Sequence, residues 1–136
     1  MSTKKILVVD DSLVVVKTSE MILTKAGYTV FTAADGSEAI GLVRREKPDL
    51  VVLDISFPPD VGHGGGVAWD GILIMQWLKR MEEAKNTPVI IITGQDPAKY
   101  REPAMKLGAV AFLTKPVNND ELLKLIGETL TAKIAG

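Results

Sequence analysis

The sequence predicts an α/β fold: a doubly wound, five-stranded parallel sheet between two layers of helices. The alternation of two kinds of segment predicts this three-layer architecture. Short runs rich in β-branched residues alternate five times with longer amphipathic segments, which is typical of parallel strands joined by crossover helices. Because such crossovers are right-handed, the helices are expected on both faces of the sheet. The strands are predicted at residues 5–9, 29–33, 50–53, 88–92 and 110–113, and the helices at 12–26, 37–46, 71–84, 98–107 and 119–133.

Local signals mark several helix ends. Gly27 follows the first predicted helix, at a position where glycine commonly terminates one. Two later helices begin with the spacing of a capping box, at Asp35 with Glu38 and at Asn118 with Glu121. A third begins with an N-cap residue followed by proline, at Asp96–Pro97. Pro103 lies inside the fourth helical pattern, where a missing N–H and a ring clash cost about 3 kcal/mol in a regular helix. We therefore expect this helix to be kinked or to begin later than its apolar pattern.

One connection is unusually long. The segment between Asp54 and Asp70 is rich in glycine and proline, and it is longer than the roughly 2–6 residues of an ordinary strand-to-helix turn. We interpret residues 56–69 as an insertion into a single domain that spans residues 1–136. The insertion is expected to form a mobile loop beside the carboxyl ends of the strands.

Composition excludes several function classes. The chain has 136 residues and a formal net charge of -1, which provides no basic face for nucleic acid. It contains no cysteine, so disulfides, thiolate nucleophiles and cysteine-ligated zinc are excluded. No signal-peptide pattern begins the chain, and no apolar run approaches the roughly 20 residues of a membrane helix. We expect a cytoplasmic protein that is not inserted in a membrane.

Four of the five apolar runs end in residues suited to metal or phosphate chemistry. The first run ends in Asp10 and Asp11, the third in Asp54, the fourth in Thr93 and the fifth in Lys115. In open α/β sheets, ligands bind in the crevice beyond the carboxyl ends of the strands. If the first strand pairs with the third, the three carboxylates converge within a few ångströms at that crevice.

Such a cluster favours a particular chemistry. Carboxylates packed together either raise a pKa or recruit a cation, and an all-oxygen site without His or Cys selects Mg²⁺ or Mn²⁺. A bound Mg²⁺ accepts phosphate oxygens as further ligands, while Lys115 can neutralise a second phosphoryl oxygen and the Thr93 hydroxyl can donate to a third. With no Ser–His or Cys–His pair evident, the natural nucleophile is a carboxylate, which would form an acyl phosphate.

These motifs together resemble the receiver domain of two-component response regulators. That family has an acidic pair after the first strand, a phosphoacceptor Asp after the third, a Thr or Ser after the fourth, and a Lys-Pro pair after the fifth with an aromatic residue three positions earlier. The sequence has each of them, within roughly residues 4–130: Asp10–Asp11, Asp54, Thr93, Lys115–Pro116 and Phe112. The resemblance implies a flavodoxin-like, CheY-like sheet with the strand order 2-1-3-4-5.

The resemblance also implies a phosphoacceptor and a metal site. Asp54 would accept a phosphoryl group from a sensor histidine kinase or a histidine phosphotransfer domain, in a Mg²⁺- or Mn²⁺-dependent reaction. Asp11, Asp54 and the backbone carbonyl of Ser56 would ligate the metal, and Asp10 would hold it mostly through water. The protein would catalyse only its own phosphorylation and dephosphorylation, and would otherwise act as a signalling switch.

The same resemblance implies how the switch would work. Thr93 and Phe112 are the expected switch residues, and Lys115–Pro116 is an expected cis peptide that aims the lysine. The aspartyl phosphate would alter partner binding, and the protein would be a monomer or a weak phosphorylation-dependent dimer. The apolar start of the first helix, Leu13–Val16, is wider than one buried stripe requires. Part of it is expected to be exposed and to dock the phosphodonor.

Two other function classes stay open on the sequence alone. A haloacid-dehalogenase-type phosphatase also uses a strand-end Asp and Mg²⁺, but it needs a second Asp two residues later, where this chain has Ser56. The other class is a non-phosphorylated interaction module or a flavin binder on the same fold. The intact Asp54, Lys115 and acidic pair count against the module, and an aromatic content of 5% counts against the flavin. The sequence names neither the cognate kinase nor the downstream target.

Overall fold

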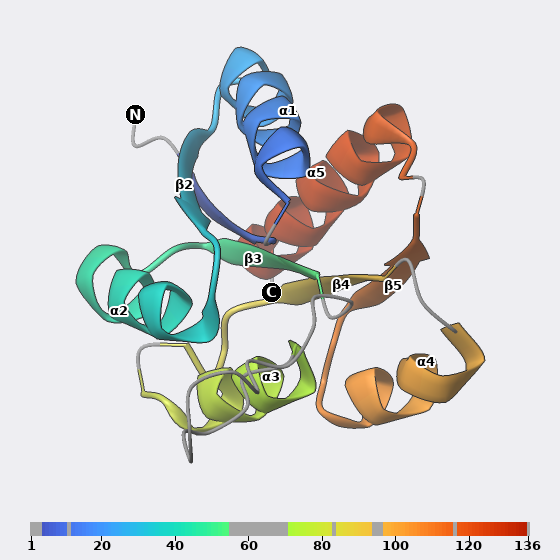
Figure 1. The fold of residues 1–136 in the computed structure, drawn as a ribbon. Helices are drawn as coiled ribbons and strands as arrows, with labels where there is room; N and C mark the ends of the chain where they lie inside the picture. Colours follow the sequence, from blue (N-terminus) through green and yellow to red (C-terminus); the bar gives the residue numbers. More distant parts are fainter. Residues whose placement is uncertain are drawn as a thin grey trace.

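The computed structural model describes residues 4–10, 12–54, 71–82, 84–93, 97–115 and 117–135. Its strands form one parallel sheet in the order β2-β1-β3-β4-β5, which confirms the predicted fold class (Figure 1). The strands are β1 (Lys5–Val9), β2 (Thr29–Ala33), β3 (Leu50–Asp54), β4 (Val89–Thr93) and β5 (Ala111–Thr114). The helices are α1 (Leu13–Lys25), α2 (Gly36–Glu46), α3 (Gly71–Arg80), α4 (Pro97–Lys106) and α5 (Asn119–Ala135).

The helices form two layers, one on each face of the sheet. Helices α1 and α5 cover one face, and α2, α3 and α4 cover the other (Figure 1). Side chains alternate between the two faces along each strand. Leu7, Val9 and Leu53 therefore pack toward the face with α2, α3 and α4, whereas Ile6 and Val8 pack toward α1 and α5.

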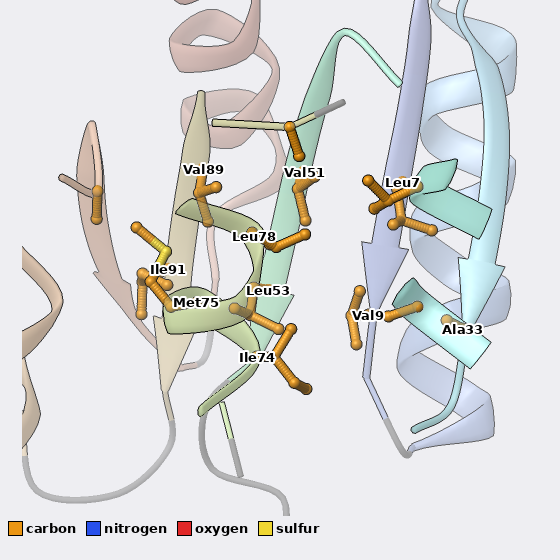
Figure 2. Packing of buried hydrophobic residues seen from close by; sticks show 14 of the residues in the cluster. Leu7, Val9, Ala33, Val51, Leu53, Ile74, Met75, Leu78, Val89 and Ile91 are labelled. Atoms are coloured by element: carbon orange, nitrogen blue, oxygen red, sulfur yellow. The ribbon is translucent and has the colours of Figure 1, made fainter. Parts of the chain in front are cut away.

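The core on the α3 side is built mainly of aliphatic side chains. Ile74, Met75 and Leu78 of α3 lie against Leu53 and Ile91 of the central strands (Figure 2), and all five are at most 1% exposed. Fully burying one such side chain stabilises a fold by about 1.5–3 kcal/mol. The strands β1, β3 and β4 are buried along most of their length, and Asp10, Asp54 and Thr93 stand at or directly after their carboxyl ends.

The expected caps are present where the structure describes them. The Asp35 side chain accepts a hydrogen bond from the Glu38 N–H at 2.8 Å, and the Asn118 side chain accepts one from the Glu121 N–H at 3.1 Å. Gly27 follows α1 with φ of +103°, a conformation that glycine adopts without strain. Asp96, the N-cap expected before α4, lies outside the described residues.

Most boundaries lie within two residues of the predicted ones, but the expectation that the third helix reaches residue 84 was wrong. Helix α3 ends at Arg80. The Met81 N–H is shared between the carbonyls of Trp77 and Leu78, at 3.2 and 3.3 Å, and the Ala84 N–H donates to the Met81 carbonyl at 3.0 Å. These tight turns bury Met81 and Ala84 while they redirect the chain into β4, so the apolar pattern continues beyond the end of the helix.

The fourth helix also differs from one expectation. Helix α4 begins at Pro97 and runs without interruption to Lys106, so the alternative of a later start was wrong. Proline at the first helical position suits a helix N-terminus because its missing N–H would have no partner there. The other alternative, a kink at Pro103, stays a prediction.

Several expectations lie outside the described residues. These are the insertion over residues 56–69, the metal ligands Asp11 and Ser56, and the cis peptide before Pro116. In the part of the chain that the structure describes, no helix is long and apolar enough to cross a membrane.

Candidate functional site

Two buried carboxylates and one lysine meet at the carboxyl edge of the sheet. Asp10 directly follows β1, Asp54 ends β3 and Lys115 directly follows β5. The Lys115 Nζ lies 2.8 Å from Asp54 Oδ2 and 3.4 Å from Asp10 Oδ2. Both aspartates are almost fully buried, at 3% and 2% exposed, whereas the Lys115 side chain keeps 28% of its surface exposed. The site is therefore a charged cluster with one accessible side.

Backbone contacts fix the orientation of Asp10. Its N–H donates to the Ala33 carbonyl at the end of β2, at 3.0 Å, and its Oδ1 accepts a hydrogen bond from the Ser12 N–H, at 2.9 Å. Ser12 in turn caps α1, since its Oγ accepts from the Val15 N–H at 3.4 Å. The carboxylate is thus held between the sheet and the first turn of α1. Sequence reasoning missed this role of Ser12, although a serine just before an apolar helical run is a typical N-cap.

The electrostatics of the cluster follow from burial and from like charges at short range. Burial raises the pKa of Asp10 above its ordinary value, the hydrogen bond from the Ser12 N–H opposes this shift, and the neighbouring Asp54 charge adds to it. Burial alone would lower the pKa of Lys115, but its hydrogen bond and charge interaction with Asp54, together with the Asp10 charge, outweigh burial and raise that pKa. Lys115 therefore stays protonated at neutral pH and compensates the two carboxylates.

Thr93 and Phe112 lie on the two strands nearest to Lys115. Thr93 ends β4 and is fully buried, and its carbonyl accepts a hydrogen bond from the Lys115 N–H at 2.9 Å. This bond ties the ends of β4 and β5 together. Phe112, in the middle of β5, is half-buried and packs against the core on the side of α2, α3 and α4.

The donor atoms present fit a hard divalent cation. Asp10 and Asp54 offer only carboxylate oxygens, the ligands that Mg²⁺ and Mn²⁺ prefer. Asp10 and Asp54 both lie beside the Lys115 ammonium, so two negative charges are close together, and a cation would offset their repulsion. Within the described residues, no group of three or more His, Cys, Asp or Glu side chains could hold a metal. The further ligands that the sequence implies, Asp11 and the Ser56 carbonyl, fall outside those residues.

A groove adjoins the cluster between α1 and α5. Its volume is about 550 Å³, and Lys115 contributes to its wall. Apolar side chains of both helices and of β4 line most of the rest, with three small polar residues among them: Val14, Val15, Thr18, Ser19, Ile92, Val117, Asn119 and Leu122. The expectation that part of Leu13–Val16 is exposed is confirmed for Val14, which is 76% exposed, while Val16 is buried at 8%.

Comparison with known proteins shows which family this chain resembles. The model of the response regulator receiver domain matches residues 6–127. Sporulation initiation phosphotransferase F of Bacillus subtilis is 33% identical over 133 residues, which cover 98% of both chains. The alkaline phosphatase synthesis transcriptional regulatory protein PhoP of the same species is 35% identical over 119 residues, which cover 88% of this chain and 45% of PhoP. This chain therefore spans less than half the length of PhoP.

Solved structures agree with the sequence relatives. A CheY-like receiver domain protein from Methanospirillum hungatei superposes with a TM-score of 0.85 and 28% identity, over 99% of this chain and all of that chain. The chemotaxis protein CheY4 of Vibrio cholerae superposes with a TM-score of 0.81 and 28% identity, over 93% of this chain and 98% of CheY4.

Receiver domains are signalling switches of two-component systems and not conventional enzymes. They interact with histidine kinases or phosphotransfer proteins, and they generally use Mg²⁺. Since the family model covers most of its length and a curated relative matches it from end to end, this chain belongs to the response regulator receiver domain family.

Proposed function

We propose that the protein is a phosphorylation switch in which Asp54 accepts a phosphoryl group from a phosphohistidine donor. The observation that carries the proposal is the position of Asp54: a buried carboxylate at the end of a central strand, 2.8 Å from the Lys115 ammonium. A carboxylate oxygen of Asp54 would attack phosphorus, the P–N bond to the donor imidazole would break, and the imidazole would leave with the bonding pair. The product is an aspartyl phosphate.

The surrounding residues have separate roles in this proposal. Lys115 would bind an oxygen of the phosphoryl group during its transfer to Asp54. Its positive charge would stabilise the negative charge of that group in the transition state. Thr93, at the end of the neighbouring strand, would donate its hydroxyl to another phosphoryl oxygen. Phe112 would respond through the packing of β5 against α4, and the altered surface would change partner binding.

The proposed metal site combines described and undescribed residues. Asp11, Asp54 and the Ser56 carbonyl would hold Mg²⁺ or Mn²⁺, and Asp10 would contact it mostly through water. A bound cation would neutralise part of the negative charge of the phosphoryl group. Asp10 is suited to the water-mediated role because the Ser12 N–H already occupies one of its oxygens, at 2.9 Å.

The phosphodonor would dock on α1 and the groove beside it. Val14 is 76% exposed and Met21 is 69% exposed, and their spacing of seven residues places them on one side of the helix. Val14 also lines the groove whose wall includes Lys115. A sensor histidine kinase or a histidine phosphotransfer domain, whose phosphohistidine must approach Asp54 over this edge, fits such a surface.

The remaining parts of the proposal concern the whole molecule. Residues 1–136 would form one receiver domain with an insertion over about residues 56–69. The protein would act in the cytoplasm as a monomer or a weak phosphorylation-dependent dimer, without binding nucleic acid through this domain.

Substitution of Asp54 tests the proposal directly. Wild-type protein with Mg²⁺ and acetyl phosphate should gain the mass of one phosphoryl group in intact-protein mass spectrometry, and Asp54→Ala should gain none. Asp120→Asn, a change of an exposed carboxylate on α5, is the matched control and should react normally. Undiminished phosphorylation of Asp54→Ala would refute the assignment of the phosphoacceptor.

A further inference from the structure

A second groove lies at the opposite, amino-terminal edge of the sheet, next to the starts of β4 and β5. Its volume is about 520 Å³. Residues from both helical layers contribute to it: Lys79 from α3 and Thr129 from α5, with Gly108 and Val110 from the connection into β5. Among the described residues that line it there is no aspartate or glutamate, but there are two lysines, Lys79 and Lys85. The groove therefore carries positive charge without a carboxylate in its wall.

Lys79 is held across this groove. Its Nζ donates to the Thr87 carbonyl at 3.3 Å, and its Cε lies 3.6 Å from the position that a Cβ on Gly108 would take. In the part of the chain that the structure describes, no carboxylate lies within ion-pair distance of this ammonium, and burial lowers its pKa. An ammonium has three N–H donors, so the contact with Thr87 leaves donors for a ligand.

Lys85 differs from Lys79 because it already has a carboxylate partner, at the exposed surface. Its Nζ lies 3.1 Å from a carboxylate oxygen of Glu82. The charge that the described residues leave uncompensated in the groove is therefore that of one ammonium. A single ammonium matches a monoanion, and a dianion such as a phosphate monoester would retain an excess negative charge.

The rest of the lining favours an anion with an apolar body. Pro88 and Val110 contribute apolar surface, and Val110 is 46% exposed although it is a β-branched aliphatic residue. Asn86 adds a neutral amide beside the lysines. A ligand that placed its charge on Lys79 and its apolar part on Val110 would bury surface that the folded chain leaves open to water.

We propose that this groove binds a small carboxylate with an apolar body, and that Lys79 is the charge partner of the carboxylate. The site lies at the edge of the sheet opposite to Asp54, so its occupation does not depend on phosphorylation chemistry. The competing explanation is that Lys79 only links α3 to the start of β4 through the Thr87 carbonyl. These two explanations differ in whether a ligand binds.

Phenylacetate is a suitable probe, with its neutral isostere phenylacetamide as the comparison. In an amide NMR titration of the full chain, phenylacetate should produce saturable shifts at Gly108 and Val110, and phenylacetamide should bind at least about tenfold more weakly because it lacks the charge. Lys79→Met should weaken phenylacetate binding by about tenfold or more. Lys17→Met, which removes an exposed lysine from α1, is the matched control and should bind normally.

Two further variants keep the test decisive. Lys79→Arg retains the positive charge and should bind phenylacetate within a few fold of wild type, which separates loss of charge from local distortion. Asp54→Asn should bind phenylacetate as wild type does, so that failure of this site and failure of the phosphoacceptor assignment are distinguishable. Shifts that do not saturate, equal binding of the amide, or equal binding by the Lys79→Met and wild-type proteins would each overturn the proposal.

Discussion

The two edges of the sheet each hold a half-buried lysine, and the two lysines differ in their partners. At the carboxyl edge, Lys115 contacts two buried carboxylates, and its pKa is raised. At the amino-terminal edge, Lys79 contacts a backbone carbonyl, and its pKa is lowered by burial. Burial alone therefore does not decide the direction in which the pKa of a lysine shifts, because the charge of the groups around it can reverse the effect.

The lysine variants provide the strongest test of this difference. In metal-free protein at neutral pH, Lys115→Met should lower the free energy of unfolding by about 1–3 kcal/mol, because it leaves two buried carboxylates without their compensating charge. It should also slow phosphorylation by acetyl phosphate by about 10²-fold. Lys79→Met removes one hydrogen bond to a carbonyl and keeps the apolar stem, so its cost should stay within about 1 kcal/mol.

Urea unfolding with EDTA and a phosphorylation time course measure both quantities. The Lys115 variant is expected to remain folded, since the core beneath it is aliphatic. If Lys115→Met and Lys79→Met lowered the free energy of unfolding equally, the two carboxylates beside Lys115 would have no special effect on stability.

The two grooves can be compared through one exposed valine beside each. Val14→Glu, at the carboxyl edge, should slow phosphotransfer from a phosphorylated histidine phosphotransfer domain by about tenfold, since a charge would be buried in the apolar contact. Phosphorylation by acetyl phosphate, which needs no docking surface, should change little. Val110→Glu, at the other edge, should leave both reactions unchanged. If Val14→Glu slowed the two reactions equally, the defect would lie in the site itself and α1 would not be the docking surface.

Two glycines with similar backbone conformations test whether a side chain at position 108 would disturb Lys79 and thereby lower stability. Gly27 and Gly108 have φ of +103° and +99°, so replacing either with alanine should cost about 1–2 kcal/mol. A Cβ on Gly27 would meet nothing within 4 Å, whereas one on Gly108 would lie 3.6 Å from Lys79 Cε, an ordinary contact distance. Thermal or urea unfolding should therefore give equal losses. A much larger loss for Gly108→Ala would show that Lys79 is held more rigidly than this distance implies.

The smallest expected effect is a difference in titration. In metal-free protein, NMR of the lysine side chains should place the pKa of Lys79 below 10.5 and that of Lys115 above it. Because the folded chain releases the Lys79 proton earlier than the unfolded chain, stability should rise with pH in the window just below 10.5. The contribution of Lys115 is present below 10.5 and is lost as pH rises through its raised pKa. Identical titration of both lysines would remove the electrostatic difference between the two edges.

The sequence predicted the carboxyl edge well, because the chemistry there lies at strand ends. A parallel strand is a short apolar run, and the residue that follows it can be located to within one position, so the sequence alone predicts that Asp10, Asp54 and Lys115 lie together. The same argument predicts the position of Thr93. The roles assigned to them stay predictions, as do those of Asp11, Ser56, Phe112 and Pro116.

The other edge could not be predicted, for physical reasons. The end of α3 depends on turns that continue its apolar pattern through Met81 and Ala84, so periodicity extended the helix by four residues. The groove at this edge brings together Lys79, Gly108 and Thr129, which belong to three different elements. None of these residues has a motif around it, and only the packed structure shows that they share a wall. At the carboxyl edge, the hydrogen bond from the Ser12 N–H to Asp10 could not be predicted either, because it depends on the path of the chain between β1 and α1.

The contacts of Lys115 span most of the chain. Its partner Asp54 is 61 positions away and its partner Asp10 is 105 positions away, and the lysine follows the last strand of the sheet. During synthesis, the earlier strands leave the ribosome well before β5, and domains fold as units once their parts are available. A nascent chain therefore holds both aspartates without their lysine until β5 pairs with β4. If Lys115 assists the phosphorylation of Asp54 as proposed, a chain in which β5 has not yet paired with β4 should accept a phosphoryl group much more slowly than the folded protein.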